Sequence, residues 1–208
     1  MTKLKIWGRN NSMNVQKAMW AVSEVGVDYE RLDAGLQFGI VDEPWFGDLN
    51  PSRTVPVLDD DGFYVWESNV IIRYLAAKYA MGRLMPADLE RRAELEMWMD
   101  WQQTVVMPGL GPAFVGLVRT PEADRNHAEI NAGAEVVRAA LELLDKRLAG
   151  RAYILGDSFT AADIPLGCVA YRWLAMPVAH GDIANVRAWY DRLTSLPAFA
   201  EHVMLPLT

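Results

Sequence analysis

One stretch, residues 50–75, constrains the fold of this chain more than any other part of it. It contains an apolar run at 55–58, an acidic turn that ends at Gly62, and a second apolar run at 63–66. Asp-Gly between two apolar runs is a strong signal for a β-hairpin. Apolar residues then recur at helical spacing after Glu67. The stretch therefore predicts strand, turn, strand and helix, in that order.

Two features of this stretch indicate a binding site. A cis bond before Pro56 would turn the N–H and C=O of Val55 outward, where they can pair with a bound peptide. The hydroxyl of Ser68 and the N–H groups at the start of its helix suit a carboxylate, and the adjacent Glu67 suits an ammonium. A ligand end that carries both charges, as an α-amino acid does, would fit. The alternative is an ordinary helix cap preceded by a turn proline.

The combination of these motifs resembles the glutathione-binding half of the cytosolic glutathione transferase family, in particular its bacterial nu, theta and zeta types. The resemblance rests on Asn50-Pro51, Val-Pro-Val-Leu, the acidic turn, Glu67-Ser68 and an Ile-x-x-Tyr-Leu pattern from Ile71. It implies a thioredoxin-like α/β domain followed by an all-α helical-bundle domain. It also implies that Val55 pairs with the cysteinyl backbone of glutathione and that Glu67 and Ser68 hold its γ-glutamyl end.

The order of elements before the hairpin fits such a first domain. Apolar patterns predict a strand at 4–8, a helix ended by Gly26, a strand at 27–32 and a short irregular helix at about 44–48. Gly82 and Pro86 indicate a linker. The predicted domains are 1–79 for glutathione binding, 80–87 as the linker and 88–208 as the helical domain that supplies the electrophile site.

The loop before the first helix is the predicted reaction centre, because the family places its thiol-activating group there. Ser12 falls where zeta-type enzymes carry a serine, and Asn14 falls where beta-type enzymes have cysteine and nu-type enzymes asparagine. Both residues are therefore catalytic candidates, and which lies nearer the sulfur is left open. The alternative for each is simple helix capping. Lowering a thiol pKa from about 8.5 by about 2 units takes roughly 2.7 kcal/mol, which a hydroxyl, an amide and a helix N-terminus can supply together.

The site that binds the glycyl carboxylate departs from the family pattern. Val41 stands nearest the position where many relatives carry a polar side chain, and Thr54 stands where lysine or glutamine often precedes Val-Pro. Arg9, Arg53, Gln37 or the backbone of Phe38 are the candidates to replace that contact. The full set predicted to bind glutathione is Arg9, Arg53, Thr54, Val55, Pro56, Glu67 and Ser68.

The second half of the chain reads as helical throughout. A long helical pattern runs from Asp88 towards Val118 and is bent by prolines, and a second long helix is predicted to open at Thr120-Pro121-Glu122 and end at Gly150. Thr160 and Asp163 have the spacing of a capping box before a buried helix over 161–174, on which Cys168 is interpreted as a core residue. An apolar co-substrate pocket is predicted from Trp98, Gln102, Met107 and Trp173.

Composition limits the other classes of function. The chain has 208 residues, a net charge of −7, one cysteine and three histidines without ligand spacing. It is therefore not expected to bind nucleic acid, to form a disulfide framework or to hold a metal. No signal peptide is expected before Leu4, and no apolar run approaches membrane length. A cytoplasmic protein without membrane or nucleic-acid partners is expected, and the family resemblance implies a homodimer.

The predicted activity is that of a glutathione S-transferase, a detoxification enzyme that joins the glutathione thiolate to an electrophilic, apolar co-substrate. Glutathione enters as a substrate, and no metal is expected. One alternative is a nu-type glutathione-dependent disulfide or peroxide reductase. Another is a non-catalytic interaction module of the same fold. A zeta-type isomerase is disfavoured because that group's Ser-Ser-Cys is Ser12-Met13-Asn14 here.

Overall fold

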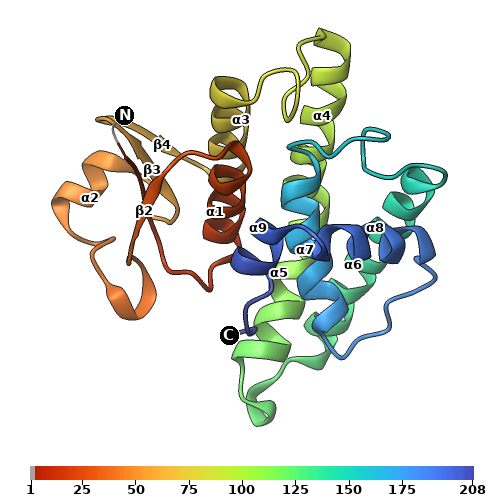
Figure 1. Ribbon diagram of the computed structural model, residues 1–208. Coiled ribbons are helices and arrows are strands. Elements are labelled where there is room, and N and C mark those ends of the chain that lie inside the picture. Colours follow the sequence, from red (N-terminus) through yellow and green to blue (C-terminus); the bar gives the residue numbers. More distant parts are fainter. Residues whose placement is uncertain (1–2) are drawn as a thin grey trace. The chain divides into compact units, whose positions relative to one another are not determined.

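A computed structural model describes residues 3–208, which divide into two compact units (Figure 1). The first unit runs to Met85 and also takes in the late segment Ala198–Leu205. The second runs from Pro86 to Pro197 and includes Pro206–Thr208. The division predicted from the sequence places all of 88–208 in the helical domain.

The first unit is built on a four-stranded sheet in the order β2-β1-β3-β4. Parallel pairing joins β1 to β2, and antiparallel pairing joins β1 to β3 and β3 to β4. The bounds are Leu4–Trp7 for β1, Tyr29–Leu32 for β2, Val57–Asp60 for β3 and Phe63–Trp66 for β4. The predicted strand at 55–58 thus begins two residues later, because Pro56 has no N–H to donate to the ladder.

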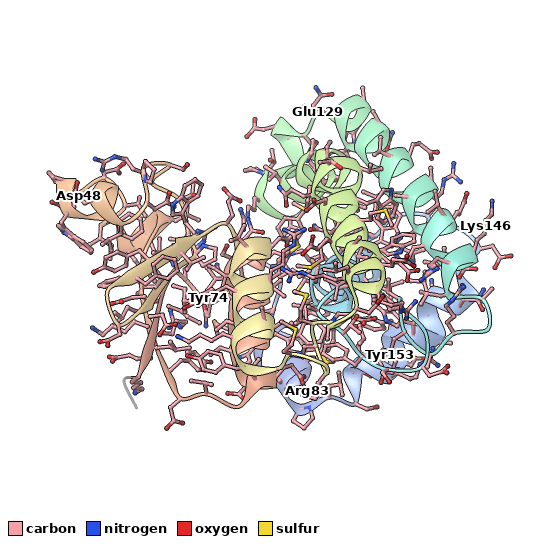
Figure 2. The ribbon with its side chains drawn as sticks, turned by 90° about the horizontal axis from the view of Figure 1, so that it is seen from above. Asp48, Tyr74, Arg83, Glu129, Lys146 and Tyr153 are labelled. Carbon is pink, nitrogen blue, oxygen red and sulfur yellow. The ribbon has the colours of Figure 1, made fainter. Side chains whose placement is uncertain are left out.

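The hairpin between β3 and β4 turns on Asp61 and Gly62, which both have positive φ angles (55° and 87°). Two such residues define the type I′ turn that matches the twist of paired strands. Figure 2 shows Tyr74 on the neighbouring helix α3, and its hydroxyl donates to Asp60 Oδ2 at 2.6 Å. The hairpin and α3 are therefore held together at the end of β3.

Helices cover both faces of this sheet (Figure 1). The bounds are Met13–Val25 for α1, Leu36–Phe38 for the 3-10 helix η1, Pro44–Leu49 for α2 and Ser68–Tyr79 for α3. As predicted, α1 ends at Gly26, whose left-handed conformation lets its N–H donate to Ser23. On the α2 side, Phe46 and Val57 are fully buried together with Ala34.

The C-terminal helix α9, Pro197–His202, returns to this unit. The ring of Phe199 meets Trp20 of α1 edge to face at 4.8 Å. His202 Nε2 lies 2.7 Å from Ser23 Oγ, and His202 is almost completely buried. Burial lowers the pKa of His202, against the nearby Glu201 carboxylate, which raises it. The tail of the chain is thus anchored to α1.

The second unit begins with one long interrupted helix, as predicted. Its parts are α4 (Leu89–Trp101), the π-helix η2 (Gln102–Val106), α5 (Met107–Phe114) and the π-helix η3 (Val115–Arg119). Asp88 caps α4 by accepting from the N–H of Arg91 at 2.9 Å. Pro108 and Pro112 lack N–H groups and cannot continue the i→i−4 pattern, and wider π-type turns flank the segment that contains them.

The next long helix, α6 (His127–Leu148), begins later than predicted. Thr120-Pro121-Glu122 leads only into a short 3-10 turn, η4 (Glu122–Asp124). The prediction of a helix opening there was wrong, because Asn126 supplies the cap and accepts from the N–H of Glu129 at 3.2 Å. Figure 2 shows Glu129 and Lys146 towards the two ends of α6.

The helices α7 (Asp163–Ala175) and α8 (Ala184–Thr194) complete this unit, and Cys168 is fully buried on α7 as predicted. Asp163 is fully buried and accepts hydrogen bonds from the N–H of Ile154 (3.1 Å), the N–H and Oγ1 of Thr160 (2.9 and 3.1 Å) and Trp189 Nε1 (2.9 Å). Burial raises the pKa of Asp163 to about 6, and these four donors oppose that rise. The bond from the Thr160 N–H to the Asp163 carboxylate is one half of the predicted capping box. The Thr160 hydroxyl donates to the same carboxylate, and the Asp163 N–H donates to the Thr160 carbonyl (3.0 Å) instead of to that hydroxyl.

Candidate functional site

Ser12 stands at the start of α1, as predicted, but its side chain does not cap the helix. Its backbone N–H donates to the carbonyl of Arg9 (3.2 Å), and its own carbonyl accepts from the N–H of Gln16 (2.9 Å). Among the described residues no partner is found for its hydroxyl, which lies in a residue that is 7% exposed. The capping alternative for the Ser12 hydroxyl is therefore not what the structure shows. The catalytic role of Ser12 stays a prediction.

The first turn of α1 offers further donors. Met13 and Asn14 hold the first two helical positions, and their backbone N–H groups have no acceptor within residues 3–208. The first turn of α1 contains no acidic side chain. A helix end of this kind favours an anion, because its N–H groups point outward and its dipole is positive there. The region next to Ser12 is therefore suited to a thiolate.

Asn14 and Ser68 come together although 54 residues separate them in the sequence. The Ser68 hydroxyl donates to Asn14 Oδ1 at 3.2 Å, so the predicted γ-glutamyl contact and a predicted catalytic group touch each other. Deeper between the same two helices, Lys17 Nζ donates to Asn69 Oδ1 at 3.4 Å, and the Lys17 side chain is fully buried. These two side-chain hydrogen bonds join the N-terminal parts of α1 and α3.

Glu67 immediately precedes α3 and has a positive φ angle of 68°. A non-glycine residue in this region of conformational space is uncommon, and such residues cluster at active sites and ligand clamps. Its side chain is exposed, and among the described residues no partner is found for its carboxylate. The position beside Ser68 fits the predicted ammonium contact, which stays a prediction.

Val55 is held by a small network around the buried Asn50. Asn50 Nδ2 donates to the carbonyl of Thr54 at 2.9 Å and to its Oγ1 at 3.3 Å, while Asn50 Oδ1 accepts from the N–H of Ser52 at 2.9 Å. The Val55–Pro56 peptide bond is cis. Within the described part of the chain, the N–H and C=O of Val55 have no hydrogen-bond partner. They are available to pair with an extended peptide.

Gly8 lets Val55 approach the start of α1. A Cβ atom on Gly8 would lie 2.4 Å from Val15 Cγ2 and 3.2 Å from Val55 Cβ. Arg9 is also close, because a Cβ atom on Gly35 would lie 3.3 Å from Arg9 Nη1 and 3.5 Å from Val55 Cγ2. The structure therefore brings the predicted residues Arg9 and Val55 to one region beside α1.

Arg53 contacts the backbone of the segment before α2. Its Nη1 donates to the backbone carbonyls of Val41 (3.1 Å) and Glu43 (3.0 Å), and its guanidinium lies against Gly47 of α2. These contacts tie the segment before α2 to the loop before Val55. A direct contact between Arg53 and glutathione stays a prediction.

The four residues predicted for the co-substrate pocket occupy different environments in the second unit. Gln102 and Trp173 are fully buried, and Met107 donates its N–H to the carbonyl of Gln102 in the π-type turn. Trp98 instead lines a pocket of about 410 Å³ with Met97, Trp101, Leu143, Glu94 and Arg147. The pocket role of these residues stays a prediction.

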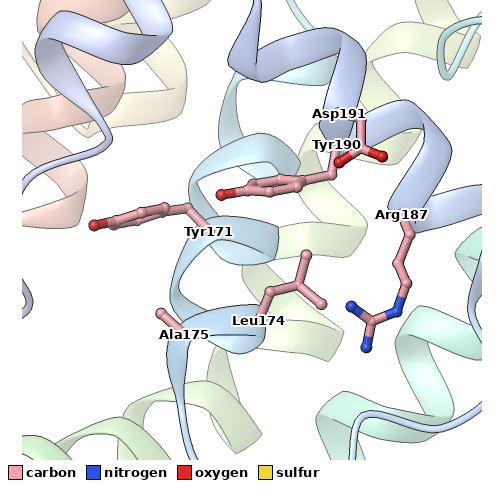
Figure 3. Close-up of a pocket in the computed structure, with 6 residues that line it drawn as sticks. All are labelled: Tyr171, Leu174, Ala175, Arg187, Tyr190 and Asp191. Atoms are coloured by element: carbon pink, nitrogen blue, oxygen red, sulfur yellow. The ribbon is translucent and has the colours of Figure 1, made fainter.

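A further pocket in this unit, of about 350 Å³, lies between α7 and α8 (Figure 3). Tyr171 and Tyr190 point the same way along it, above Leu174, and Arg187 extends from α8. It contains none of the four residues predicted for the co-substrate.

The sequence analysis did not identify three residues that support the site in the structure. These residues are Asn50, Lys17 and Asn69. Asn50 carried a signal, since it belongs to the Asn-Pro motif that precedes Val-Pro. Lys17 carried none, because a lysine within a helical pattern normally indicates a solvent-exposed face.

Comparison with known proteins agrees with the fold. Residues 2–77 match the family model for the glutathione S-transferase N-terminal domain, and residues 128–192 match that for the C-terminal domain. The chain belongs to the glutathione S-transferase family.

Individual relatives match over almost the full chain. Glutathione S-transferase GstB of Escherichia coli K12 is 38% identical over 207 residues, which cover 99% of this chain and 100% of that protein. Glutathione S-transferase 3 of Zea mays is 32% identical and covers 98% of this chain and 94% of its own. A theta class glutathione S-transferase from Xanthomonas axonopodis pv. citri, solved with glutathione bound, is 42% identical with a TM-score of 0.96, and the match covers all of both chains.

No group of three or more histidine, cysteine or acidic side chains is arranged to hold a metal ion among residues 3–208. In the same part of the chain, no helix is both long and apolar enough to cross a membrane.

Proposed function

We propose that this protein is a glutathione transferase that binds glutathione on its first unit and activates the thiol for attack on an electrophilic, apolar co-substrate. Ser12 and Asn14 donate to the sulfur, the backbone of Val55 pairs with the cysteinyl residue, and Glu67 and Ser68 hold the γ-glutamyl end. The observation that carries the proposal is the Ser12 hydroxyl, which caps no helix and stands at the N-terminus of α1.

The energy required is within the reach of these groups. A pKa decrease of about 2 units for the bound thiol takes roughly 2.7 kcal/mol of preferential stabilisation of the thiolate. A hydrogen bond to a charged acceptor contributes about 1.5–3 kcal/mol, and a helix N-terminus about 0.3–1 kcal/mol. Ser12 and the end of α1 together contribute about 1.8–4 kcal/mol, a range that includes the energy required, and Asn14 adds a second donor. No general base is needed, because the thiol proton can pass to solvent.

The remaining predictions are part of the proposal. Residues 1–79 would bind glutathione, 80–87 would link the domains, and 88–208 would supply the electrophile site with Trp98, Gln102, Met107 and Trp173. Arg9, Arg53, Gln37 or the backbone of Phe38 would serve the glycyl end, and Thr54 belongs to the same predicted glutathione-binding set. A cytoplasmic location and a role in detoxification stay predictions from the family resemblance.

We also propose a homodimer, in which a second copy covers apolar surface that a single chain leaves exposed. Phe63, Trp66 and Val70 are 58%, 37% and 44% exposed on β4 and α3 of the first unit. In the second unit, Met97 and Leu143 are 63% and 48% exposed beside the pocket that Trp98 lines. Exposed apolar surface of this kind is typical of protein interfaces.

Turnover tests the proposal. The purified chain would be assayed with saturating glutathione against halogenated aromatics, epoxides, peroxides and mixed disulfides. We expect conjugation with at least one electrophile and a large loss of rate in Ser12→Ala. A protein that binds immobilised glutathione but reduces only peroxides or mixed disulfides would favour the reductase, and one that fails to bind glutathione would favour the non-catalytic module.

A further inference from the structure

Lys17 places a basic side chain where the stability of the fold gives no reason for one. It lies on α1, and its side chain is fully buried. Its Nζ donates to Asn69 Oδ1 of α3 at 3.4 Å. Removing an ammonium from water is costly, and even a well-paired buried cation often stabilises a protein no more than an apolar side chain of similar volume. A buried ionisable side chain beside a candidate site therefore indicates a use for its charge.

Helix geometry directs the Lys17 side chain towards the proposed thiol site. Lys17 follows Asn14 by three positions, so the two side chains lie on one face of α1, one turn apart. Long side chains on a helix point back towards its N-terminus. Asn69, which the Lys17 Nζ contacts, directly follows Ser68 at the start of α3. The Lys17 Nζ therefore lies behind the first turns of both helices, which the bond between Ser68 and Asn14 also joins.

We propose that the buried ammonium of Lys17 stabilises the thiolate of bound glutathione through its charge, without touching the sulfur. This inference rests on the proposed function, because it assumes that the sulfur lies at the start of α1. A nearby opposite charge favours the ionised form of an acid, and surroundings of low dielectric constant strengthen that effect. The same charge would favour the γ-glutamyl carboxylate at the start of α3.

Other charged side chains also belong to the elements around Lys17. The helix α1 packs against α3 and β1. Two of these side chains lie in the last turns of their helices, and one of β1 lies 4.0 Å from the carboxylate of Asp59. On these three elements and in the residues that lead into the two helices, the charged side chains besides Lys17 are Lys5, Arg9, Glu24, Glu67, Arg73 and Lys78. Variants of Lys17 leave all six in place, so a change in the thiol pKa reports the Lys17 side chain.

The expected effect is large enough to measure. A unit charge about 10 Å away, at an effective dielectric constant of about 20, shifts a pKa by about 1 unit. Lys17→Gln keeps a polar side chain with an N–H donor but removes the charge. The thiol pKa of glutathione bound to Lys17→Gln should therefore be higher than in wild-type protein by about 1 unit.

Two further variants separate the charge from the hydrogen bond. Lys17→Arg keeps a cation at this position, because arginine stays protonated in proteins. Asn69→Ala removes the acceptor of the printed bond and leaves the Lys17 ammonium in place. In both variants, the thiol pKa of bound glutathione should stay within about 0.3 units of the wild-type value, since the charge is kept.

Ultraviolet titration of the thiolate, on the full chain saturated with glutathione, tests the inference. A rise of about 1 unit in Lys17→Gln that neither charge-keeping variant shows supports it. An unchanged thiol pKa in Lys17→Gln overturns it, and so does an equal rise in Lys17→Arg or Asn69→Ala, because the effect would then not come from the charge.

A measurement on wild-type protein covers the case in which Lys17→Gln does not fold. Nuclear magnetic resonance of protein with isotope-labelled lysine distinguishes an ammonium from a neutral amine at Nζ, and the Lys17 signal is the one that Lys17→Arg lacks. At the pH where half of the bound thiol is ionised, Lys17 should be protonated. A neutral amine at that pH overturns the inference and leaves the proposed function standing. If wild-type protein binds no glutathione, or the bound thiol titrates near its free value, the proposed function fails and this inference fails with it.

Discussion

Removing the side chain of Asn50 should weaken glutathione binding without touching the thiol-activating groups. Asn50 Nδ2 donates to the Thr54 carbonyl and its Oδ1 accepts from the Ser52 N–H, both at 2.9 Å. Each bond contributes about 1 kcal/mol net, so Asn50→Ala should lower the free energy of unfolding by about 2 kcal/mol. For a chain of this size that corresponds to a fall in Tm of roughly 4–8 °C.

The effect on binding follows from the position of Val55. The two bonds fix the loop that presents the Val55 backbone, so losing them leaves that loop to be ordered when glutathione binds. If one third to all of the 2 kcal/mol is then spent at binding, the Kd of glutathione should rise about three- to thirtyfold. Ser12 and Asn14 lie on α1 and should keep their effect on the thiol pKa of glutathione once it is bound.

Calorimetric titration with glutathione and thermal unfolding measure the two quantities on one sample. Ser52→Ala is the matched control, because Ser52 takes part in this loop through its backbone N–H and its own side chain is exposed. A Kd within twofold of wild type in Asn50→Ala, together with the expected fall in Tm, would show that the loop anchor does not serve binding.

Three other perturbations have defined outcomes. Asp163→Asn replaces an oxygen that accepts from the Thr160 N–H and Oγ1, so unfolding in urea should show a loss of about 2–4 kcal/mol, whereas the exposed Asp157→Asn should change little. Because the pKa of His202 is lower in the folded state, the unfolded chain binds more protons as the pH falls through the usual value of 6.5. The free energy of unfolding should therefore decrease below about pH 6.5. Melting curves recorded over a pH series should show a smaller decrease in His202→Gln. Gly8→Ala would place its Cβ 2.4 Å from Val15 Cγ2 and 3.2 Å from Val55 Cβ. Because this displaces Val55, the affinity for glutathione should fall at least tenfold. An unchanged affinity would contradict this interpretation of the contact.

Local signals in the sequence were sufficient for most of the elements around the site. Asp-Gly between apolar runs predicted the β3–β4 hairpin, and both turn residues have the positive φ angles that this turn requires. Gly26 ends α1 and Asp88 caps α4, as their positions in the apolar pattern indicate. In each case the residues that decide the structure are neighbours in the chain.

Prediction from the sequence was wrong where two local signals for a helix start competed. It was not possible where a contact joins residues that are far apart in the chain. Thr120-Pro121 resembles a helix start, but the structure uses Asn126, six residues further on. The hydrogen bond between Ser68 and Asn14 joins residues 54 apart, and the one between His202 and Ser23 joins residues 179 apart. No periodicity or short motif reports such pairs, because they depend on how the helices pack.

The site residues show the same division. The family motif named Ser12 and Ser68, but only the structure shows that Ser12 leaves its own helix uncapped and that Ser68 is already bonded to Asn14. Arg53 is a sequence-based candidate for the glycyl carboxylate, and the structure adds that its guanidinium donates to the backbone carbonyls of Val41 and Glu43. Charge alone does not tell whether a cation serves a ligand or the fold.

The central claim is that the start of α1 stabilises the thiolate of bound glutathione, and ultraviolet titration of that thiolate tests it most directly. In wild-type protein the thiol pKa of bound glutathione should lie about 2 units below the free value of about 8.5, and Ser12→Ala should return at least 1 unit of that difference. A wild-type complex whose thiol titrates near the free value, or an unchanged pKa in both Ser12→Ala and Asn14→Ala, would contradict the account.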